Sequence, residues 1–431
     1  MSSEWKEVRL QDVTSILGDG LHGTPEFDDN GDYYFINGNN LSNGRIVFNE
    51  KTRRVSEREY QKHWKNLNEQ TILVSINGSL GYVALYRGEK VVLGKSACYF
   101  NVRDGVDKHF VRYVMEGDFF QSYIHALATG STIKNVSLRL MRDFTFRLPS
   151  LESQQQISAV LATLDDRIAL LRETNATLEA IAQALFKSWF VDFDPVRAKQ
   201  EGRPPEGMDE ATAALFPDGF EESALGLVPR GWQVVSFTDT VDVIGGGTPK
   251  TSVTEYWNGH IPWFSVVDAP EPGNVFVIGT EKQITEAGLA NSSTKLLAGG
   301  TTIISARGTV GRLALTGREM AMNQSCYGLR GKAGDAYFTY FCTCRLVETL
   351  KQRTHGSVFD TITRNTLAGV VTVHPEKLVI LAFERLLSPV MERIRENLEQ
   401  AQTLATLRDT LLPRLISGQL RLPEAEQLVP A

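Results

Sequence analysis

Residues 157–189 read ISAVLATLDDRIALLRETNATLEAIAQALFKSW, and this stretch decides the fold. Apolar residues recur at alternating intervals of four and three over 189 − 157 = 32 steps. One polar residue, Asn175, interrupts a seam made of Ile157, Leu161, Leu164, Ile168, Leu171, Leu178, Ala182, Leu185 and Trp189. This spacing is typical of a coiled-coil helix. The stretch therefore predicts a long helix that packs against another helix.

A second stretch near the C-terminus carries a similar seam, although Arg408 occupies one of its positions. Its members are Phe383, Leu387, Val390, Ile394, Asn397, Ala401, Leu404, Leu411 and Leu415. Because each seam has one Asn near its middle, we expect an antiparallel pair, centred on Leu171 and Ala401, in which the two Asn side chains fix the register. In this register Asn175 faces Asn397, Trp189 meets Phe383, Leu178 meets Ile394, and Ile168 meets Leu404. The alternative is two separate helices, each packed on its own globule.

The sequence outside these helices is duplicated. Gly23-Thr24-Pro25 recurs as Gly247-Thr248-Pro249, residues 75–81 recur as residues 305–311, and Cys98-Tyr99 recurs as Cys326-Tyr327. Gly130-Ser131 and Pro149 recur as Gly356-Ser357 and Pro375 at one constant offset. A repeat of roughly 150 residues is a duplicated domain, because solenoid units are much shorter.

Each copy has the pattern of a mixed, mostly β globule. Short β-branched or aromatic runs separated by Asn and Gly predict strands at 33–36, 71–76, 81–86 and 97–102, and at 302–305 and 313–315 in the second copy. Helices are expected at 109–126 and 337–351. The predicted fold class is α/β (α+β), with two similar globules joined by a pair of long antiparallel coiled-coil helices about a pseudo-two-fold axis. We expect globules at 1–149 and 231–375, helices at 150–194 and 376–420, a turn-rich linker at 195–230, and a tail at 421–431.

Composition is that of an ordinary globular protein of the cytoplasm. The 431 residues are 42% hydrophobic and 22% charged, and no run approaches the length of about 18 apolar residues that a membrane span needs. The four cysteines form no paired CxxC spacing, so we expect free thiols and no structural zinc. A net charge of −6 disfavours nucleic-acid binding only mildly, because a local basic face is sufficient.

Sequence signals of catalysis are weak. We find neither a dinucleotide-binding glycine fingerprint nor a HExxH metal pair. Gly88 to Ser96 resembles a phosphate loop but has one residue too many between its glycines. Asp192 to Pro195 resembles a methyltransferase loop but lacks the expected ending and follows a helix, so a helix terminator is the better interpretation. We therefore predict no catalytic residue and no metal ligand.

Several motifs, in order and at matching spacing, resemble one family along the whole chain: the specificity subunits of type I restriction–modification systems. They are GGGTPK at 245–250, EYWNGHIPW at 255–263, Leu148-Pro149 followed by QQQI at 154–157, LFKSWFVDFDP at 185–195, and LRDTLLPRLISG at 407–418. The start of the second helix departs from the pattern, because Val373-His374-Pro375-Glu376 is not followed by a Gln run.

The resemblance implies a function. Each globule would be a target-recognition domain that reads one half of a split double-stranded DNA sequence, in a prokaryotic cytoplasm. Two methyltransferase subunits would dock on the helices and restriction–translocase subunits would join them. Those partners would hold S-adenosylmethionine, ATP and Mg, and the chain itself would not be an enzyme. The 32 steps from Ile157 to Trp189 span roughly 48 Å, about 14 base pairs, as an upper bound on the separation of the readers.

Loops that recur in both copies supply the candidate DNA contacts, since hydroxyls and cations suit phosphates while Arg, Lys, Asn and Gln suit base edges. The candidates are Thr24, Lys95, Ser131, Lys134 and Asn135 in the first copy, and Thr248, Lys250, Arg307, Asn323, Gln324, Ser357, Arg364 and Asn365 in the second. For each one the alternative is a solvated surface residue, and Asn323 and Gln324 follow a strand turn that they could simply cap. For the whole chain the alternative is a scaffold that binds proteins or glycans.

Overall fold

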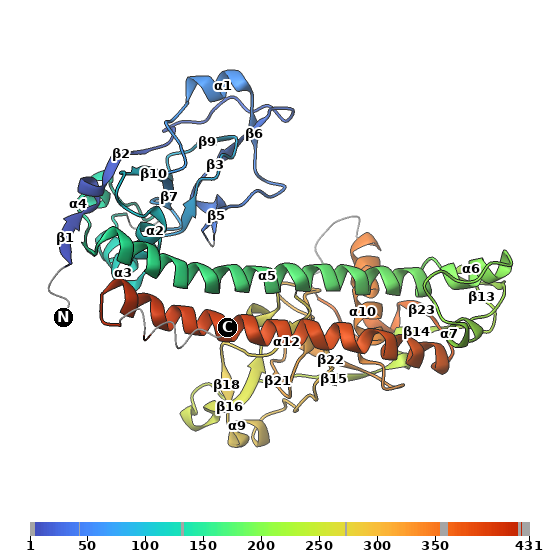
Figure 1. The fold of residues 1–431 in the computed structure, drawn as a ribbon. Helices are drawn as coiled ribbons and strands as arrows, with labels where there is room; N and C mark the ends of the chain where they lie inside the picture. Colours follow the sequence, from blue (N-terminus) through green and yellow to red (C-terminus); the bar gives the residue numbers. More distant parts are fainter. Residues whose placement is uncertain are drawn as a thin grey trace. The chain divides into compact units, whose positions relative to one another are not determined.

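The computed structural model describes residues 5–42, 44–130, 133–271, 274–353, 361–420 and 424. The chain folds as two compact units, one comprising residues 1–167 and 403–431, the other residues 168–402. Each unit contains one globule and one stretch of two long helices, α5 (Leu151–Phe190) and α12 (Lys377–Ile416) (Figure 1). Among the described residues, no helix combines the length and the apolarity needed to cross a membrane.

The first globule is built on an antiparallel sheet with the strand order β2-β10-β7-β8. Every residue of β7, β8 and β10 is buried, which explains their unbroken apolar runs. A smaller sheet has the order β6-β3-β9, with β3 parallel to β9. The strands are β1 (Lys6–Arg9), β2 (Thr14–Asp19), β3 (Tyr33–Ile36), β4 (Leu41–Ser42), β5 (Arg45–Ile46), β6 (Arg54–Val55), β7 (Thr71–Ser75), β8 (Val83–Leu85), β9 (Val91–Leu93), β10 (Ala97–Val102) and β11 (Thr145–Leu148).

The second globule repeats this topology. Its main sheet has the order β15-β22-β19-β20-β17, which matches the first apart from the added β17, and its smaller sheet has the order β18-β16-β21. The duplicated sequence therefore folds into duplicated sheets. The strands are β14 (Gln233–Ser236), β15 (Val241–Gly245), β16 (Trp257–Phe264), β17 (Phe276–Val277), β18 (Gln283–Ile284), β19 (Thr302–Ser305), β20 (Leu313–Thr316), β21 (Ala321–Met322), β22 (Cys326–Gly331) and β23 (Val371–His374).

The helix expected at 109–126 is two helices, α2 (Lys108–Glu116) and α3 (Asp118–Leu127). They separate at Gly117, whose backbone is extended, with φ −72° and ψ 152°. A Cβ at this position would lie 2.5 Å from Ile416 Cδ1, so the break has a glycine that packs against α12. Its counterpart α10 (Ala336–Arg353) is continuous, as expected. Shorter helices are α1 (Glu57–Lys62), α4 (Leu138–Asp143), α8 (Phe237–Thr240), α9 (Glu286–Ala290) and α11 (Arg364–Ala368).

The long helices pack in the expected antiparallel register, so the alternative of two separate helices is wrong. In the second unit Asn397 Nδ2 donates to Asn175 Oδ1 at 2.9 Å, and the rings of Trp189 and Phe383 lie 5.7 Å apart. In the first unit Arg408 Nη1 donates to Asp165 Oδ1 at 2.8 Å. The interface candidates Leu164, Ile168, Leu171 and Leu404 are buried, and Leu178 packs against the cluster that contains Ile394.

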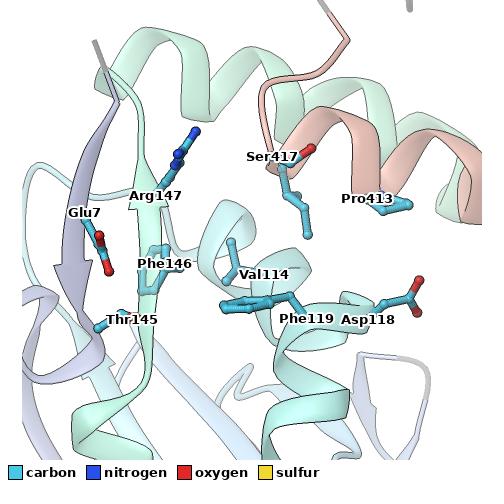
Figure 2. Close-up of a pocket in the computed structure, with 10 residues that line it drawn as sticks. Glu7, Val114, Asp118, Phe119, Thr145, Phe146, Arg147, Pro413 and Ser417 are labelled. Atoms are coloured by element: carbon cyan, nitrogen blue, oxygen red, sulfur yellow. The ribbon is translucent and has the colours of Figure 1, made fainter. Parts of the chain in front are cut away.

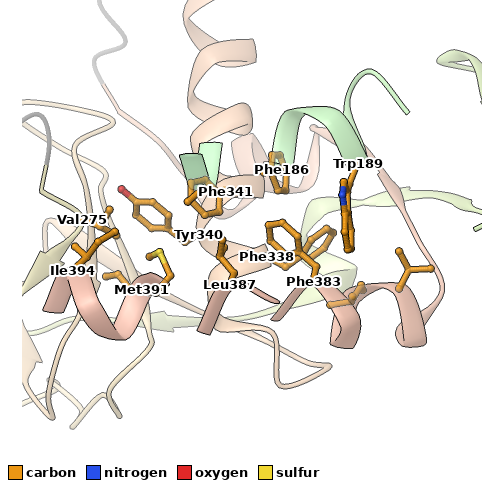
Figure 3. Packing of buried hydrophobic residues seen from close by; sticks show 14 of the residues in the cluster. Phe186, Trp189, Val275, Phe338, Tyr340, Phe341, Phe383, Leu387, Met391 and Ile394 are labelled. Atoms are coloured by element: carbon orange, nitrogen blue, oxygen red, sulfur yellow. The ribbon is translucent and has the colours of Figure 1, made fainter. Parts of the chain in front are cut away.

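The buried face of the helices widens by one residue where they meet the second globule, although the seam residues Ala182, Trp189, Phe383, Leu387 and Ile394 stay buried. Phe186 and Met391 are buried there, whereas the expected seam residues Leu185 and Val390 are only partly buried. Phe186 packs against the rings of Phe338 and Phe341 from α10 (Figure 3). The globule therefore buries an additional residue beside the seam on each helix, which a pairwise heptad pattern does not anticipate.

The segment expected to be a turn-rich linker is ordered. It contains α6 (Asp194–Gln200), α7 (Glu210–Ala214) and a hairpin of β12 (Phe220–Ser223) and β13 (Gly226–Pro229). Val196 and Phe216 are buried in the same cluster as Trp189 and Trp232, and this packing attaches the segment to the core. Phe193, with φ 57°, makes the turn between α5 and α6, which agrees with a helix terminator at 192–195.

Candidate nucleic-acid interface

One edge of the main sheet in the first globule collects most of the loops that were singled out by sequence. Asp19 pairs with Cys98, and Ser75 pairs with Ala97, so the end of β2, the end of β7 and the start of β10 meet at this edge. Residues 134–136 join them, because the Val136 amide donates to the Ile76 carbonyl at 2.8 Å. We call residues 20–25, 76–82, 94–96 and 134–136 the first loop edge.

The second globule has an equivalent edge. Gly245 pairs with Tyr327, and Ser305 pairs with Cys326, so the end of β15, the end of β19 and the start of β22 meet at this edge. The Ile362 amide donates to the Ala306 carbonyl at 2.9 Å and brings the residues before α11 alongside. Residues 246–250, 306–312, 323–325 and 361–365 form the second loop edge.

The central loop of each edge has the same backbone. Gly78 and Gly308 both have φ 77°, while Gly81 and Gly311 have φ 82° and 80°. These are left-handed conformations that favour glycine, which explains why the glycine spacing recurs in the two sequences. The loops after β7 and β19 are therefore copies of one turn.

Hydrogen bonds inside the two loops also match. The Ser75 hydroxyl accepts from the Tyr82 amide at 2.8 Å, and the Ser305 hydroxyl accepts from the Arg312 amide at 2.8 Å. In both loops the Ser carbonyl accepts from the second glycine at 2.9 Å. A serine at the end of the strand thus closes each loop and leaves its tip to carry variable side chains.

The tips differ in chemistry. The first presents Asn77 and Ser79, and the second presents Arg307 and Thr309. Asn77 was not among the predicted contacts, although its alignment with Arg307 in the repeat was the signal that could have identified it. Asn77 Nδ2 donates to Asn135 Oδ1 at 3.0 Å, so the structure brings a predicted residue and a missed one together.

Two predicted residues of the second edge also meet. The Thr248 hydroxyl donates to Gln324 Oε1. Close approach explains the two glycines before Thr248, since a Cβ on Gly246 would lie 1.9 Å from the Asn323 carbonyl oxygen and one on Gly247 would lie 2.3 Å from Ser293 Oγ. The Gly-Gly-Thr sequence therefore allows this loop to lie directly against the turn before β22.

Asn323 is used differently from its neighbour. Its side-chain Oδ1 accepts from the Ser325 backbone amide at 3.0 Å, and its backbone amide donates to the Phe264 carbonyl at 2.9 Å. The half-buried side chain therefore caps the turn, while Gln324 is exposed.

Arg364 and Asn365 lie on the outer side of β15. Arg364 Nη2 donates to the Val243 carbonyl at 2.7 Å, and its guanidinium carbon lies 5.9 Å from the centre of the Tyr327 ring. Both residues line a polar cavity of about 450 Å³ together with Thr238 and Asp242. The hydrogen-bonding groups that line this cavity therefore lie beside the second loop edge.

The remaining candidates are exposed side chains or lie outside the described residues. Thr24, Lys95, Lys134, Lys250 and Arg307 are exposed, and in the described part of the chain none of the four cations forms an ion pair. Their charges are therefore available to an anionic partner. Ser131 and Ser357 lie outside the described residues.

An apolar cavity of about 290 Å³ lies elsewhere in the first unit, between β1, β11, α3 and the end of α12 (Figure 2). None of the candidate contacts lines it. Ile416, which lines it, corresponds to Phe190 by the offset 416 − 190 = 226 between the helices, and the Phe190 ring packs 4.9 Å from Phe338. Within the described ranges, no group of three His, Cys, Asp or Glu side chains is placed to hold a metal ion.

Comparison with known proteins identifies the family. The model of the type I restriction modification DNA specificity domain matches residues 2–180 and 229–370. The specificity subunit of the type I restriction enzyme HindI from Haemophilus influenzae is 27% identical over 338 residues, which is 68% of this chain and 73% of that protein. The MjaIX specificity subunit from Methanocaldococcus jannaschii is 23% identical over 98% of this chain and 94% of its own length.

A solved structure has the same fold. The type I restriction–modification S subunit from M. genitalium superposes with a TM-score of 0.56 at 18% identity and covers 96% of both chains. Both relatives are named as specificity subunits of type I restriction enzymes. The chain belongs to the type I restriction–modification DNA specificity family.

Proposed function

We propose that the two loop edges each read one half of a split double-stranded DNA target, which partner subunits then methylate or cleave. The observation that carries the proposal is the copied loop: the same backbone, closed by the same serine contacts, presents different side chains in the two globules. Two domains that read different DNA sequences need a loop backbone that stays the same and side chains at its tip that differ.

The tip chemistry suits direct readout of bases. Arg307 can donate two hydrogen bonds to guanine, and an amide such as Asn77 or Gln324 can pair with adenine in the major groove. The half-sites should therefore differ in sequence, because the two tips offer different donors and acceptors.

Phosphate binding falls to the exposed cations. Lys95 and Lys134 at the first edge and Lys250 at the second are exposed, and each neutralised phosphate releases counterions. A local cationic edge of this kind can bind DNA although the whole chain carries a net charge of −6.

The long helices serve as spacer and docking surface in this proposal. Two methyltransferase subunits dock on them and restriction–translocase subunits complete the assembly, with S-adenosylmethionine, ATP and Mg bound by those partners. Support comes from the family and from relatives that are named as specificity subunits of type I restriction enzymes.

The test places the side chains of one tip on the other edge. Arg307→Asn with Thr309→Ser gives the second loop the tip of the first. Methylation mapping in cells that carry the partner subunits should show a changed second half-site, with the first half-site and the gap unaltered. The matched control is Arg203→Ala, an exposed arginine in the segment between the globules. An unchanged target, or a change in both halves, would contradict the proposal.

A further inference from the structure

The two units differ at three equivalent positions in their cores. Pro149 and Pro375 align the helices with the offset 375 − 149 = 226, so Asp165 corresponds to Met391 and Arg408 corresponds to Ala182. Asp107 and Asp335 align α2 with α10 with the offset 335 − 107 = 228, so Arg112 corresponds to Tyr340. Three positions that are ionic in the first unit are thus apolar or aromatic in the second.

In the first unit, Asp165 joins three elements. Its Oδ2 accepts from Arg112 Nη2 at 2.8 Å and from the Tyr113 hydroxyl at 2.9 Å, while its Oδ1 accepts from Arg408 Nη1 at 2.8 Å. The side chain of Arg112 is 12% exposed and that of Asp165 is 17% exposed. Burial raises the pKa of the Asp165 carboxyl, but the two guanidinium groups and the Tyr113 hydroxyl outweigh it and hold the pKa below its ordinary value.

In the second unit the equivalent residues belong to the apolar core. Ala182 and Met391 are fully buried and Tyr340 is 6% exposed, all within one cluster (Figure 3). By the offset of 226, the pair of Asp165 and Arg408 corresponds to the pair of Met391 and Ala182, and both of these residues lie in the core cluster of the second unit. The same register of the helix pair therefore accommodates a charged set in one unit and an apolar set in the other.

We propose that Arg408 makes the pairing of the long helices heterotypic, so that α12 accepts α5 and excludes a second copy of α12. In an α12–α12 pair of the same register, Arg408 would take the position of Ala182, opposite Met391 and beside Tyr340. The carboxylate that acts on Tyr340 in the second unit, Glu179, belongs to α5, and Ala405 would take its place in an α12–α12 pair. Arg408 would then lack this carboxylate, and a buried cation without a partner is strongly unfavourable.

The buried Asn pair acts in the same direction. Asn397 donates to Asn175, and Asn175 corresponds to Ala401 by the same offset of 226. In an α12–α12 pair each Asn397 would face Ala401 and lose its amide partner, which leaves a buried polar group unsatisfied. A single buried Asn pair is known to select pairing partners in coiled coils.

In an α5–α5 pair Asn175 would likewise lose Asn397 and face Leu171, since 397 − 226 = 171. The barrier there is still weaker, because Asp165 would keep Arg112 and Tyr113 from its own globule. Exclusion therefore depends mainly on α12. The consequence is that two different readers are joined in one molecule, whereas a self-paired half would present two identical readers. This inference concerns assembly and does not depend on which DNA sequence is bound.

The experiment uses the complete protein with a protease site inserted between Glu206 and Gly207, which are exposed. After cleavage of the folded protein, two preparations of different mass are mixed, dissociated in urea and returned to buffer. Native mass spectrometry then counts pairs of unlike fragments and pairs of like fragments. The wild type should give unlike pairs only.

Arg408→Ala should raise pairs of two C-terminal fragments by at least about tenfold, because it recreates the Ala182–Met391 packing. The control is Arg414→Ala, an exposed arginine on the same helix.

A second variant tests the charge itself. Met391→Asp gives a C-terminal fragment in which the introduced carboxylate of one copy can meet Arg408 of the other, so self-pairing should appear with Arg408 retained. Circular dichroism of each uncleaved variant checks that it is folded. Self-paired wild-type C-terminal fragments would overturn the proposal, as would unlike pairs only in both folded variants.

Discussion

At the scale of single residues, Gln324 is the exposed amide of the second loop edge that we propose as a reader of a base. The Thr248 hydroxyl holds its oxygen, and its side chain is exposed beside the capped turn. Gln324→Ala should cost roughly 1–3 kcal/mol of discrimination at one base pair of the second half-site and leave the first half-site unaffected. Binding to DNA with randomised half-sites, with the methyltransferase subunit present, measures both. Thr248→Val should cause a smaller loss in the same half-site.

Lys134 provides the contrasting case. Its backbone carbonyl accepts from the Gly78 amide at 2.9 Å, which places the exposed side chain next to the first loop tip. Because a lysine on a phosphate carries no base information, Lys134→Ala should weaken binding to all sequences alike and reduce the salt dependence by about one counterion. Titrations at two salt concentrations give the slope. A loss confined to one sequence would show that Lys134 reads a base.

Sequence repeats predicted which loops form the candidate site but not which hydrogen bonds their side chains make. Gly-Ser and Gly-Thr-Pro marked the loops because glycine spacing follows from backbone geometry. Asn323 and Gln324 were equivalent in the sequence, yet only the fold shows that Asn323 Oδ1 is occupied by the Ser325 amide. Thr248 and Gln324 are 76 residues apart, so their contact could not be inferred from local pattern.

At the scale of elements, α12 carries a titratable group at a buried contact with α10. Glu384 Oε1 accepts from the Phe338 amide at 2.7 Å, and burial raises the pKa of its carboxyl from 4.5 to about 7 despite that hydrogen bond. The folded state therefore binds a proton that the unfolded chain has released, and Glu384 should make stability fall as pH rises from about 4.5 to 7.

The measurement compares the wild type with Glu384→Gln, which cannot titrate. Relative to this variant, the wild type should lose on the order of 3 kcal/mol of unfolding free energy between pH 4.5 and pH 8. Urea unfolding at both pH values gives the difference, and Glu396→Gln, an exposed glutamate of α12, is the control. A gap between wild type and variant that stays constant with pH would contradict the shifted pKa.

Helix prediction was accurate where one periodicity dominated. The heptad seam gave α5 and its antiparallel partner because two facing helices alone determine most of that pattern. The buried face extends to Phe186 where a third element, α10, packs against the helices. The helix expected at 109–126 breaks at Gly117, where a side chain would meet Ile416 of α12, a contact that the local pattern does not contain.

At the scale of the whole molecule, the proposed spacer role makes a quantitative prediction. Inserting one heptad into both helices, near Asn175 and Asn397, preserves the seam and lengthens each helix by roughly 10 Å, about three base pairs. Methylation mapping should then show unchanged half-sites separated by a gap about three base pairs longer. An insertion in one helix only is the control, and it should abolish pairing of the Asn residues. Altered half-sites with the original gap would contradict the spacer role.

The overall architecture could be predicted because duplication and heptads are both visible along one chain. The ordered segment at 194–229 could not, since its Pro and Gly content is typical of turns whether or not the turns are anchored. Its anchors, Val196 and Phe216, are isolated apolar residues whose partners come from α5 and the second globule.

The division into units has a consequence for synthesis. The second unit is one continuous stretch, residues 168–402, whereas the first needs residues 403–431 to complete it. Asp165 leaves the ribosome 243 residues before Arg408, its partner across the helix pair. At translation rates of ~5–20 residues per second, this delay is roughly 10–50 seconds. The domain that is made first is therefore the one that is finished last, and during that interval the early part of α5 has its apolar seam uncovered and open to chaperones.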